Sequence, residues 1–202
     1  WYNEPKTLDT AFDVMGDIIL STAAQQYGGF TVPEVDKILA PYAKKSYDKY
    51  ISEFLKYSDE SWSGREERAI EYALDKVRRD YDQGWQGIEY KLNTVGSSRG
   101  DYPFVTVTLG LGTEQFEKMC TVSLLEVHQG GQGKAGHKKP VLFPKIVFLY
   151  DEEIHGDGKE CEDVFETGVA CSAKTMYPDW LSMSGQGYIS SMYKKYKKVI
   201  SP

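Results

Sequence analysis

The stretch at residues 93–113, NTVGSSRGDYPFVTVTLGLGT, constrains the fold more than any other part of this chain. A polar, glycine-containing turn leads into a β-branched and apolar run at residues 104–109, which stops at Gly110 and Gly112. A helical pattern begins directly afterwards. Strands that end in glycines and lead into helices are where α/β proteins tend to place ligands. The stretch therefore predicts a strand with a ligand-binding edge.

Hydrophobic periodicity divides the chain into a mainly helical part, residues 1–92, and an α/β part, residues 93–202. The helices expected in the first part cover residues 8–27, the segment after a capping box at 31–34, and the segment from a second capping box at 63–66 to about Asn93. In the second part the expected order is strand 104–109, helix 114–127, strand 141–150 and helix 161–176. A strand–helix–strand order implies parallel strands. We therefore expect an α/β fold, with both parts in one domain.

Two local patterns refine this expectation. Tyr47, Tyr50, Phe54 and Tyr57 recur at helical spacing, which is typical of side chains that pack in a core. Pro144 lies inside the expected strand 141–150, so a bulge or an edge position is predicted there.

Composition excludes several classes of protein. The formal net charge of −6 argues against a general nucleic-acid binder, which usually has a basic surface. No apolar run approaches membrane-spanning length, and the first residues lack a secretory signal pattern. The three cysteines are unclustered, which favours reduced thiols over a disulfide framework. These features predict a cytoplasmic protein.

The titratable side chains do not form a recognisable catalytic or metal motif. His128, His137 and His155 have no ligand spacing with one another or with Cys161, so we expect surface-loop histidines and no metal site. Cys171 has no activating base beside it in the sequence, which favours a buried structural thiol.

Polar groups just before the central strand offer the clearest binding chemistry. Asn93, Ser97, Ser98 and Arg99 carry amide, hydroxyl and guanidinium groups that suit the sugar or phosphate of a nucleotide. A polar turn without a ligand explains the same residues equally well. From the residues alone, the sequence indicates an α/β protein with a ligand-binding edge but no particular reaction.

Five motifs, taken in order, point to one family. They are QYGGFTVPEVDKILAPY at 26–42, EYKLNT at 89–94, YPFVTVTLGLGT at 102–113, FPKIVF at 143–148 and ACSAKTMYPD at 170–179. Together they resemble the central region of the anaerobic, oxygen-sensitive (class III) ribonucleoside-triphosphate reductases. The resemblance covers nearly the whole chain and is weakest at residues 58–85 and 180–200.

The resemblance implies a particular fold and chemistry for the parent enzyme. The family has a ten-stranded α/β barrel made of two half-barrels, and this chain is similar to part of the first. A glycyl radical, installed by an S-adenosylmethionine/iron–sulfur activase, generates a thiyl radical that reduces ribonucleoside triphosphates to deoxyribonucleotides for DNA synthesis. Formate is the usual reductant, and a structural zinc lies in the C-terminal region.

The resemblance also implies what this chain lacks. The ATP-cone, the radical cysteine, the glycyl radical and the zinc ligands are expected outside these residues. The chain contains no catalytic residue on this interpretation, and the isolated fragment is expected to be inactive.

Some binding roles are also implied. Helix 8–27 resembles the family's dimer-interface helix, so effector nucleotides are expected near Gln25 and Gln26 of a homodimer. Residues 93–106 match the stretch that enters a barrel strand, which adds Thr106 to Asn93, Ser97, Ser98 and Arg99 as candidate substrate or effector contacts. Two alternatives stay open: a nucleotide-binding regulatory or dimerisation module without catalysis, and a different glycyl-radical or α/β enzyme whose active site uses Cys171.

Overall fold

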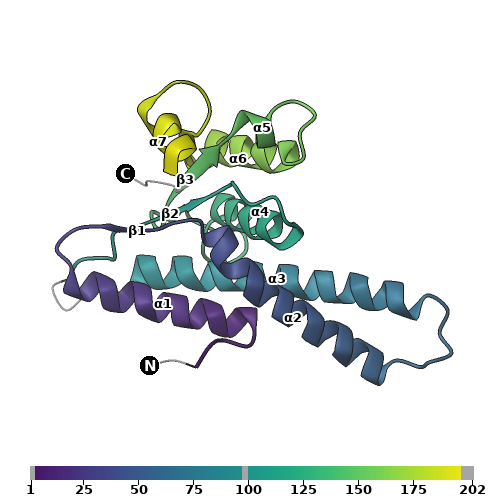
Figure 1. Cartoon of the computed structure of the whole chain (residues 1–202). Helices are drawn as coiled ribbons and strands as arrows, with labels where there is room; N and C mark the ends of the chain where they lie inside the picture. The colour runs from purple at the N-terminus through teal and green to yellow at the C-terminus, as the bar shows by residue number, and fades with distance from the viewer. Residues whose placement is uncertain (1–2, 97–99, 197–202) are drawn as a thin grey trace.

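The computed structural model describes residues 3–96 and 100–196, and its centre is a four-stranded sheet (Figure 1). The strands are β1 (Phe30–Val32), β2 (Val105–Leu109), β3 (Lys145–Tyr150) and β4 (Asp179–Ser182), in the spatial order β1-β2-β3-β4. Each neighbouring pair is parallel. The α/β class and the parallel pairing expected from the strand–helix–strand order are therefore confirmed.

Helices join successive strands and, in one place, extend well beyond the sheet. They are α1 (Leu8–Gln25), α2 (Val35–Tyr57), α3 (Arg65–Thr94), α4 (Gln115–Gly130), α5 (Glu152–His155), α6 (Glu162–Thr175) and α7 (Tyr188–Tyr196). Figure 1 shows that α2 and the first half of α3 form a hairpin that projects away from the sheet.

The two faces of the sheet have different neighbours, because side chains alternate along a strand. Val107 and Phe148 point to the face where Tyr81 and Trp85 of α3 complete the main core. Leu149 belongs to a smaller cluster on the opposite face, where α7 packs. Thr106 lies between Val105 and Val107 in β2, so its side chain points away from the main core.

The first part of the chain, residues 1–92, contains one strand besides its helices, and the sequence pattern did not predict that strand. Phe30–Val32 forms a strand in register with β2, and this pairing with a distant segment has no local signal. The prediction of a capping box at 31–34 is wrong for the same reason, because Thr31 is part of that strand. Glu34 instead precedes α2 with a φ of 47°, and its N–H donates to Thr108 Oγ1 at 2.8 Å.

The second predicted capping box, at residues 63–66, is also wrong. Gly64 precedes α3 with a φ of 68°, a left-handed conformation that glycine adopts without steric cost, and no side chain caps this end. A capping box occurs at α4 instead, where Glu114 and Glu117 each accept from the other's backbone N–H.

Three further features differ from the sequence-based expectations. Pro144 lies before β3 rather than inside a strand, as suits a residue without an N–H. Strand β4 and helix α7 follow the last predicted helix and extend the sheet. In the aromatic stripe of α2, Tyr57 is 79% exposed, so the prediction of core packing is wrong for this residue.

Candidate functional site

The two segments that were predicted to contact nucleotides meet at the amino ends of β1 and β2. The loop between α1 and β1 lies beside the segment that leads into β2, and an open pocket of about 570 Å³ separates them. Ten residues line this pocket: Ala23, Gln26, Tyr27, Gly28, Gly29, Asp101, Tyr102, Pro103, Phe104 and Phe143. The fold therefore brings the predicted Gln26 into one site with the segment after residue 100.

Glycine at position 29 permits this close approach. The backbone N–H of Phe30 donates to the carbonyl of Phe104 at 3.2 Å. A β-carbon at Gly29 would overlap the Phe104 ring and lie 3.0 Å from the same carbonyl oxygen, whereas one at Gly28 would meet nothing within 4 Å. The packing therefore requires glycine at position 29 but not at position 28.

Aromatic rings line the pocket together with the Asp101 carboxylate, and one ammonium group lies beside the Phe104 ring without being part of the lining. The rings of Phe104 and Phe143 meet edge to face, with centroids 5.4 Å apart, and Phe104 is 51% exposed. The Nζ of Lys145 lies 5.6 Å from the centroid of Phe104. An exposed aromatic face can stack on a nucleobase, and a nearby ammonium can interact with phosphate.

The other predicted site residues have different positions. Gln25 is exposed at the end of α1, with its Nε2 3.5 Å from Ser21 Oγ. Thr106 lies within β2, in register with Thr31 of β1 and Lys145 of β3. Ser97, Ser98 and Arg99 lie outside the described residues.

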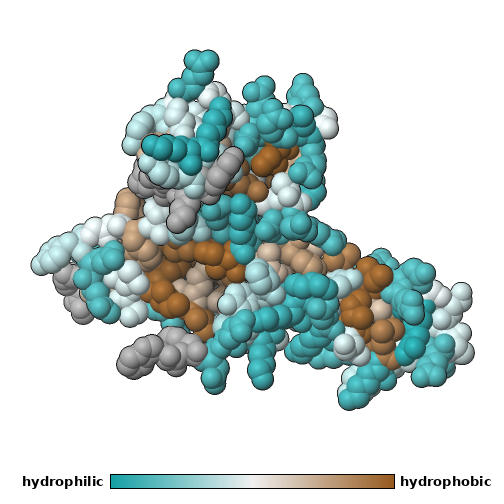
Figure 2. Space-filling view, viewed as in Figure 1, coloured by the Kyte–Doolittle hydropathy of each residue, from teal (hydrophilic) through white to brown (hydrophobic). Residues whose placement is uncertain are grey.

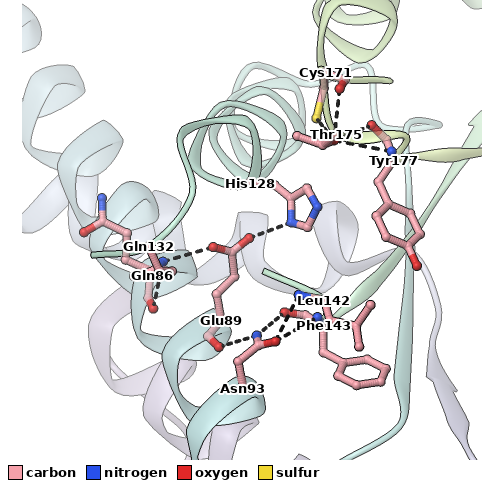
Figure 3. A network of polar contacts seen from close by, with 10 residues as sticks. All are labelled: Gln86, Glu89, Asn93, His128, Gln132, Leu142, Phe143, Cys171, Thr175 and Tyr177. Carbon is pink, nitrogen blue, oxygen red and sulfur yellow. Dashed lines mark hydrogen bonds and ion pairs between the residues drawn. The ribbon is translucent and has the colours of Figure 1, made fainter. Parts of the chain in front are cut away.

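The Asn93 amide holds the chain in front of β3 (Figure 3). Its Nδ2 donates to the carbonyls of Glu89 and Phe143, each at 2.7 Å. Its Oδ1 accepts from the backbone N–H groups of Leu142 at 3.0 Å and Phe143 at 3.2 Å. These bonds use both ends of the amide, so Asn93 can act on the pocket by positioning Phe143.

Gly110 and Gly112 follow β2 at the other end of the sheet, where their backbone amides contact a buried carboxylate. Asp36 Oδ2 accepts from the backbone N–H of Gly110 at 2.9 Å and of Gly112 at 3.2 Å. Asp36 is wholly buried, and that burial raises the pKa of its carboxyl group. The amides that an anionic ligand would need are therefore already bonded within the chain.

His155 closes the same end of the sheet and is not the surface residue that the sequence predicted. Its ring is buried, with Nε2 2.8 Å from the Gly110 carbonyl and Nδ1 3.1 Å from the Asp151 N–H. This pattern fits a neutral ring that donates from Nε2 and accepts at Nδ1. Burial lowers the pKa of His155.

His128 is also buried, so the surface-loop prediction is correct for His137 alone. The Nδ1 of His128 lies 2.8 Å from Glu89 Oε1, and Glu89 Oε2 accepts from Gln132 at 3.0 Å (Figure 3). Glu89 and His128 do occupy inward positions of the helical repeats of α3 and α4. That periodicity is the signal that could have placed them inside.

All three cysteines are buried free thiols, as was expected for Cys171. Burial raises the pKa of Cys120, Cys161 and Cys171, which disfavours the reactive thiolate at each. Within residues 3–96 and 100–196, no group of three His, Cys, Asp or Glu side chains is placed to hold a metal ion. None of the helices in these ranges has the length and apolarity needed to cross a bilayer.

The fold is that of an α/β protein with a parallel four-stranded sheet, and an open pocket lies at the amino ends of β1 and β2. The chain belongs to the anaerobic ribonucleoside-triphosphate reductase family, whose model matches residues 2–201. It is 36% identical to the enzyme of Enterobacteria phage T4 over 180 residues, which are 88% of this chain and 28% of that protein. It is 32% identical to the enzyme of Salmonella typhimurium and 31% identical to that of Escherichia coli, over 94% of this chain and 26% of each relative.

Proposed function

We propose that this chain supplies a nucleotide-contacting part of the catalytic barrel of an anaerobic ribonucleotide reductase. The observation that carries the proposal is the convergence of Gln26 and Phe104 on one pocket, from two of the motifs that resemble this family. A base stacked on Phe104 would place its phosphates within reach of Lys145. The pocket would hold either a substrate or an effector nucleotide.

The parent enzyme would reduce ribonucleoside triphosphates in the cytoplasm by radical chemistry. This chain spans about a quarter of the relatives' length, and its buried thiols have no assigned part in that chemistry. The glycyl radical, the activase and formate would act with other parts of the parent. The four parallel strands would be part of one half-barrel, in which β1 gains a neighbour at its open edge.

An apolar groove beside α1 supports a homodimer. Figure 2 shows hydrophobic residues gathered where α1, β1 and α2 meet, and Ile18 of α1 is 52% exposed there. Exposed apolar patches of this kind mark association surfaces. The groove would receive α1 of a second copy and thereby place the Gln26 end of that helix near the interface.

Two measurements test the proposal. Calorimetry of the isolated chain with ribonucleoside and deoxyribonucleoside triphosphates should give saturable binding, which Phe104→Ala weakens and Tyr90→Ala leaves unchanged. Turnover assays with activase, formate and nucleotide should give no deoxyribonucleotide. Reduction by this chain alone would contradict the assignment of the radical residues to other parts of the parent.

A regulatory or dimerisation module without catalysis is the second candidate, favoured by the position of the apolar groove and the pocket along the same helix. Sedimentation distinguishes it. If the isolated chain dimerises through α1, Ile18→Glu should give monomers, and deoxynucleoside triphosphates should strengthen the wild-type dimer. If the chain binds nucleotide but stays monomeric, the regulatory or dimerisation module is ruled out and the barrel-segment proposal remains.

A further inference from the structure

The tip of the α2–α3 hairpin carries a second pocket, far along the chain from the nucleotide site. It has a volume of about 320 Å³ and lies between the end of α2 and the start of α3. Six residues line it: Glu53, Phe54, Tyr57, Ser58, Trp62 and Tyr72. Four of these six side chains are aromatic and one is a carboxylate.

Two of the four aromatic side chains, Tyr57 and Trp62, are strongly exposed. Tyr57 is 79% and Trp62 49% exposed, and only Phe54 and Tyr72 make a ring contact with each other, at 5.3 Å between centroids. Figure 2 shows hydrophobic residues along the hairpin, bordered by hydrophilic ones, and Figure 1 shows the hairpin projecting from the body. Exposed tyrosine and tryptophan at such a tip are typical of a protein-binding surface.

The charge around the pocket favours a cationic partner. Residues 49–76 span the pocket lining and the lysines that contact it, and they include seven acidic and five basic residues, a net charge of −2. Glu53 itself lies 3.8 Å from Lys49, and both side chains are about half exposed. Its carboxylate therefore stays accessible to a second cation.

The rings of this pocket already attract cations from the chain itself. Lys56 lies 5.1 Å from the centroid of Tyr57, Arg68 lies 5.8 Å from Trp62 and Lys76 lies 5.5 Å from Tyr72. Aromatic faces bind ammonium and guanidinium groups through the negative potential of the ring. A partner's cation would use the same attraction and would have to compete with these side chains, which predicts weak, reversible binding.

We propose that the hairpin tip docks an arginine-bearing segment of a partner protein, with the guanidinium held among Tyr57, Trp62 and Glu53. A planar guanidinium can stack on an aromatic ring while it bonds a carboxylate, which suits this mixed lining better than an apolar side chain would. The proposal is independent of the nucleotide pocket.

Nuclear magnetic resonance of the full chain tests the proposal. The probe is a short peptide of alternating serine and arginine, and matched peptides replace arginine by glutamate or by leucine. The arginine peptide should shift the resonances of Tyr57, Trp62 and Tyr72 in a saturable way, and the other two should not. Equal shifts with the leucine peptide would overturn the proposal in favour of a purely apolar groove.

Matched variants locate the binding. Tyr57→Ala, which removes an exposed side chain and spares the fold, should weaken the arginine peptide at least threefold. Glu53→Gln should also weaken it, and Tyr90→Ala, an exposed tyrosine elsewhere on α3, should not. If Tyr57→Ala binds the arginine peptide with unchanged affinity, general attraction by the acidic residues explains the binding. If single-stranded oligothymidine saturates the hairpin tip, the tip is a binding site for nucleic acid. Either result would overturn the proposal.

Discussion

The ring of Phe12 on α1 occupies the space beside Gly84 on α3, so that a β-carbon at residue 84 would overlap the ring. The same ring packs edge to face on Trp85, with centroids 5.1 Å apart. Gly84→Ala should therefore lower the free energy of unfolding by about 1–3 kcal/mol, because the packed ring must move. Urea denaturation measures this difference.

Gly87 provides the matched control on the same helix, because a β-carbon there would meet nothing within 4 Å. Gly87→Ala should leave stability unchanged or raise it by up to about 1 kcal/mol, through the higher helix propensity of alanine. Equal destabilisation by both substitutions would show that α1 does not pack against α3 through Gly84.

Asp36 gives a second stability prediction. Asp36→Ala leaves the N–H groups of Gly110 and Gly112 buried without their acceptor, which should cost about 2–4 kcal/mol. Asp36→Asn keeps one acceptor oxygen and should cost less. Asp17→Ala, at an exposed position of α1, should change the free energy of unfolding by less than about 0.5 kcal/mol. An Ala variant as stable as wild type would contradict the stabilising role of these two hydrogen bonds.

The raised pKa of Asp36 also predicts how the free energy of unfolding changes with pH. Burial raises this pKa in the folded state, so the stability that the group contributes is present below its unfolded value of 3.8 and is lost as pH rises through the folded value. Asp36→Asn cannot ionise and should lack this loss. Comparing the pH dependence of unfolding of the two proteins tests the sign.

His155 predicts the opposite pH dependence. Burial lowers the pKa of His155 in the folded protein below the ordinary 6.5. The stability that the neutral ring contributes is therefore fully present above pH 6.5 and is lost as the pH falls through the folded-state pKa. The free energy of unfolding of wild type should thus decline on acidification below neutral pH. The decline should be smaller in His155→Gln and unchanged in His137→Gln, whose histidine is exposed. Identical pH profiles for all three proteins would contradict the buried, neutral ring.

Asn93 is expected to act as a positioning residue. Asn93→Ala removes the bonds to Leu142 and Phe143 and should lower the free energy of unfolding by about 1–3 kcal/mol. Thr94→Ala, next to it on the exposed side, should cost less than about 0.5 kcal/mol. If Asn93→Ala instead abolished nucleotide binding without loss of stability, direct ligand contact would replace the positioning role.

Strong periodic segments were predictable from the sequence. The apolar repeat of α3 and the β-branched run of β2 decide their own secondary structure, because their buried positions follow helical and strand spacing. Strand β1 was not predictable in this way. Its three residues form a strand by pairing with Val105–Val107 of β2, more than seventy positions later in the chain.

The site was predictable in part. The sequence pointed to Gln26 and to residues 93–106 as candidate contacts, and the fold brings Gln26 and residues 101–104 to one pocket, whose ligand stays a prediction. The sequence pointed equally to Gly110 and Gly112 as a ligand edge, and it did not reveal that Asp36 occupies their amides. That contact joins two segments far apart in the chain and depends on how α2 packs beside β2.

The most direct test of this account is to map bound nucleotide onto the sheet by nuclear magnetic resonance. We predict that ribonucleoside or deoxyribonucleoside triphosphates shift the resonances of Gln26, Tyr102 and Phe104, and that Gly29→Ala reduces these shifts while Gly87→Ala, on α3 and outside the pocket lining, does not. Shifts confined to Gly110, Gly112 and His155 would place the ligand at the opposite end of the strands and contradict the account.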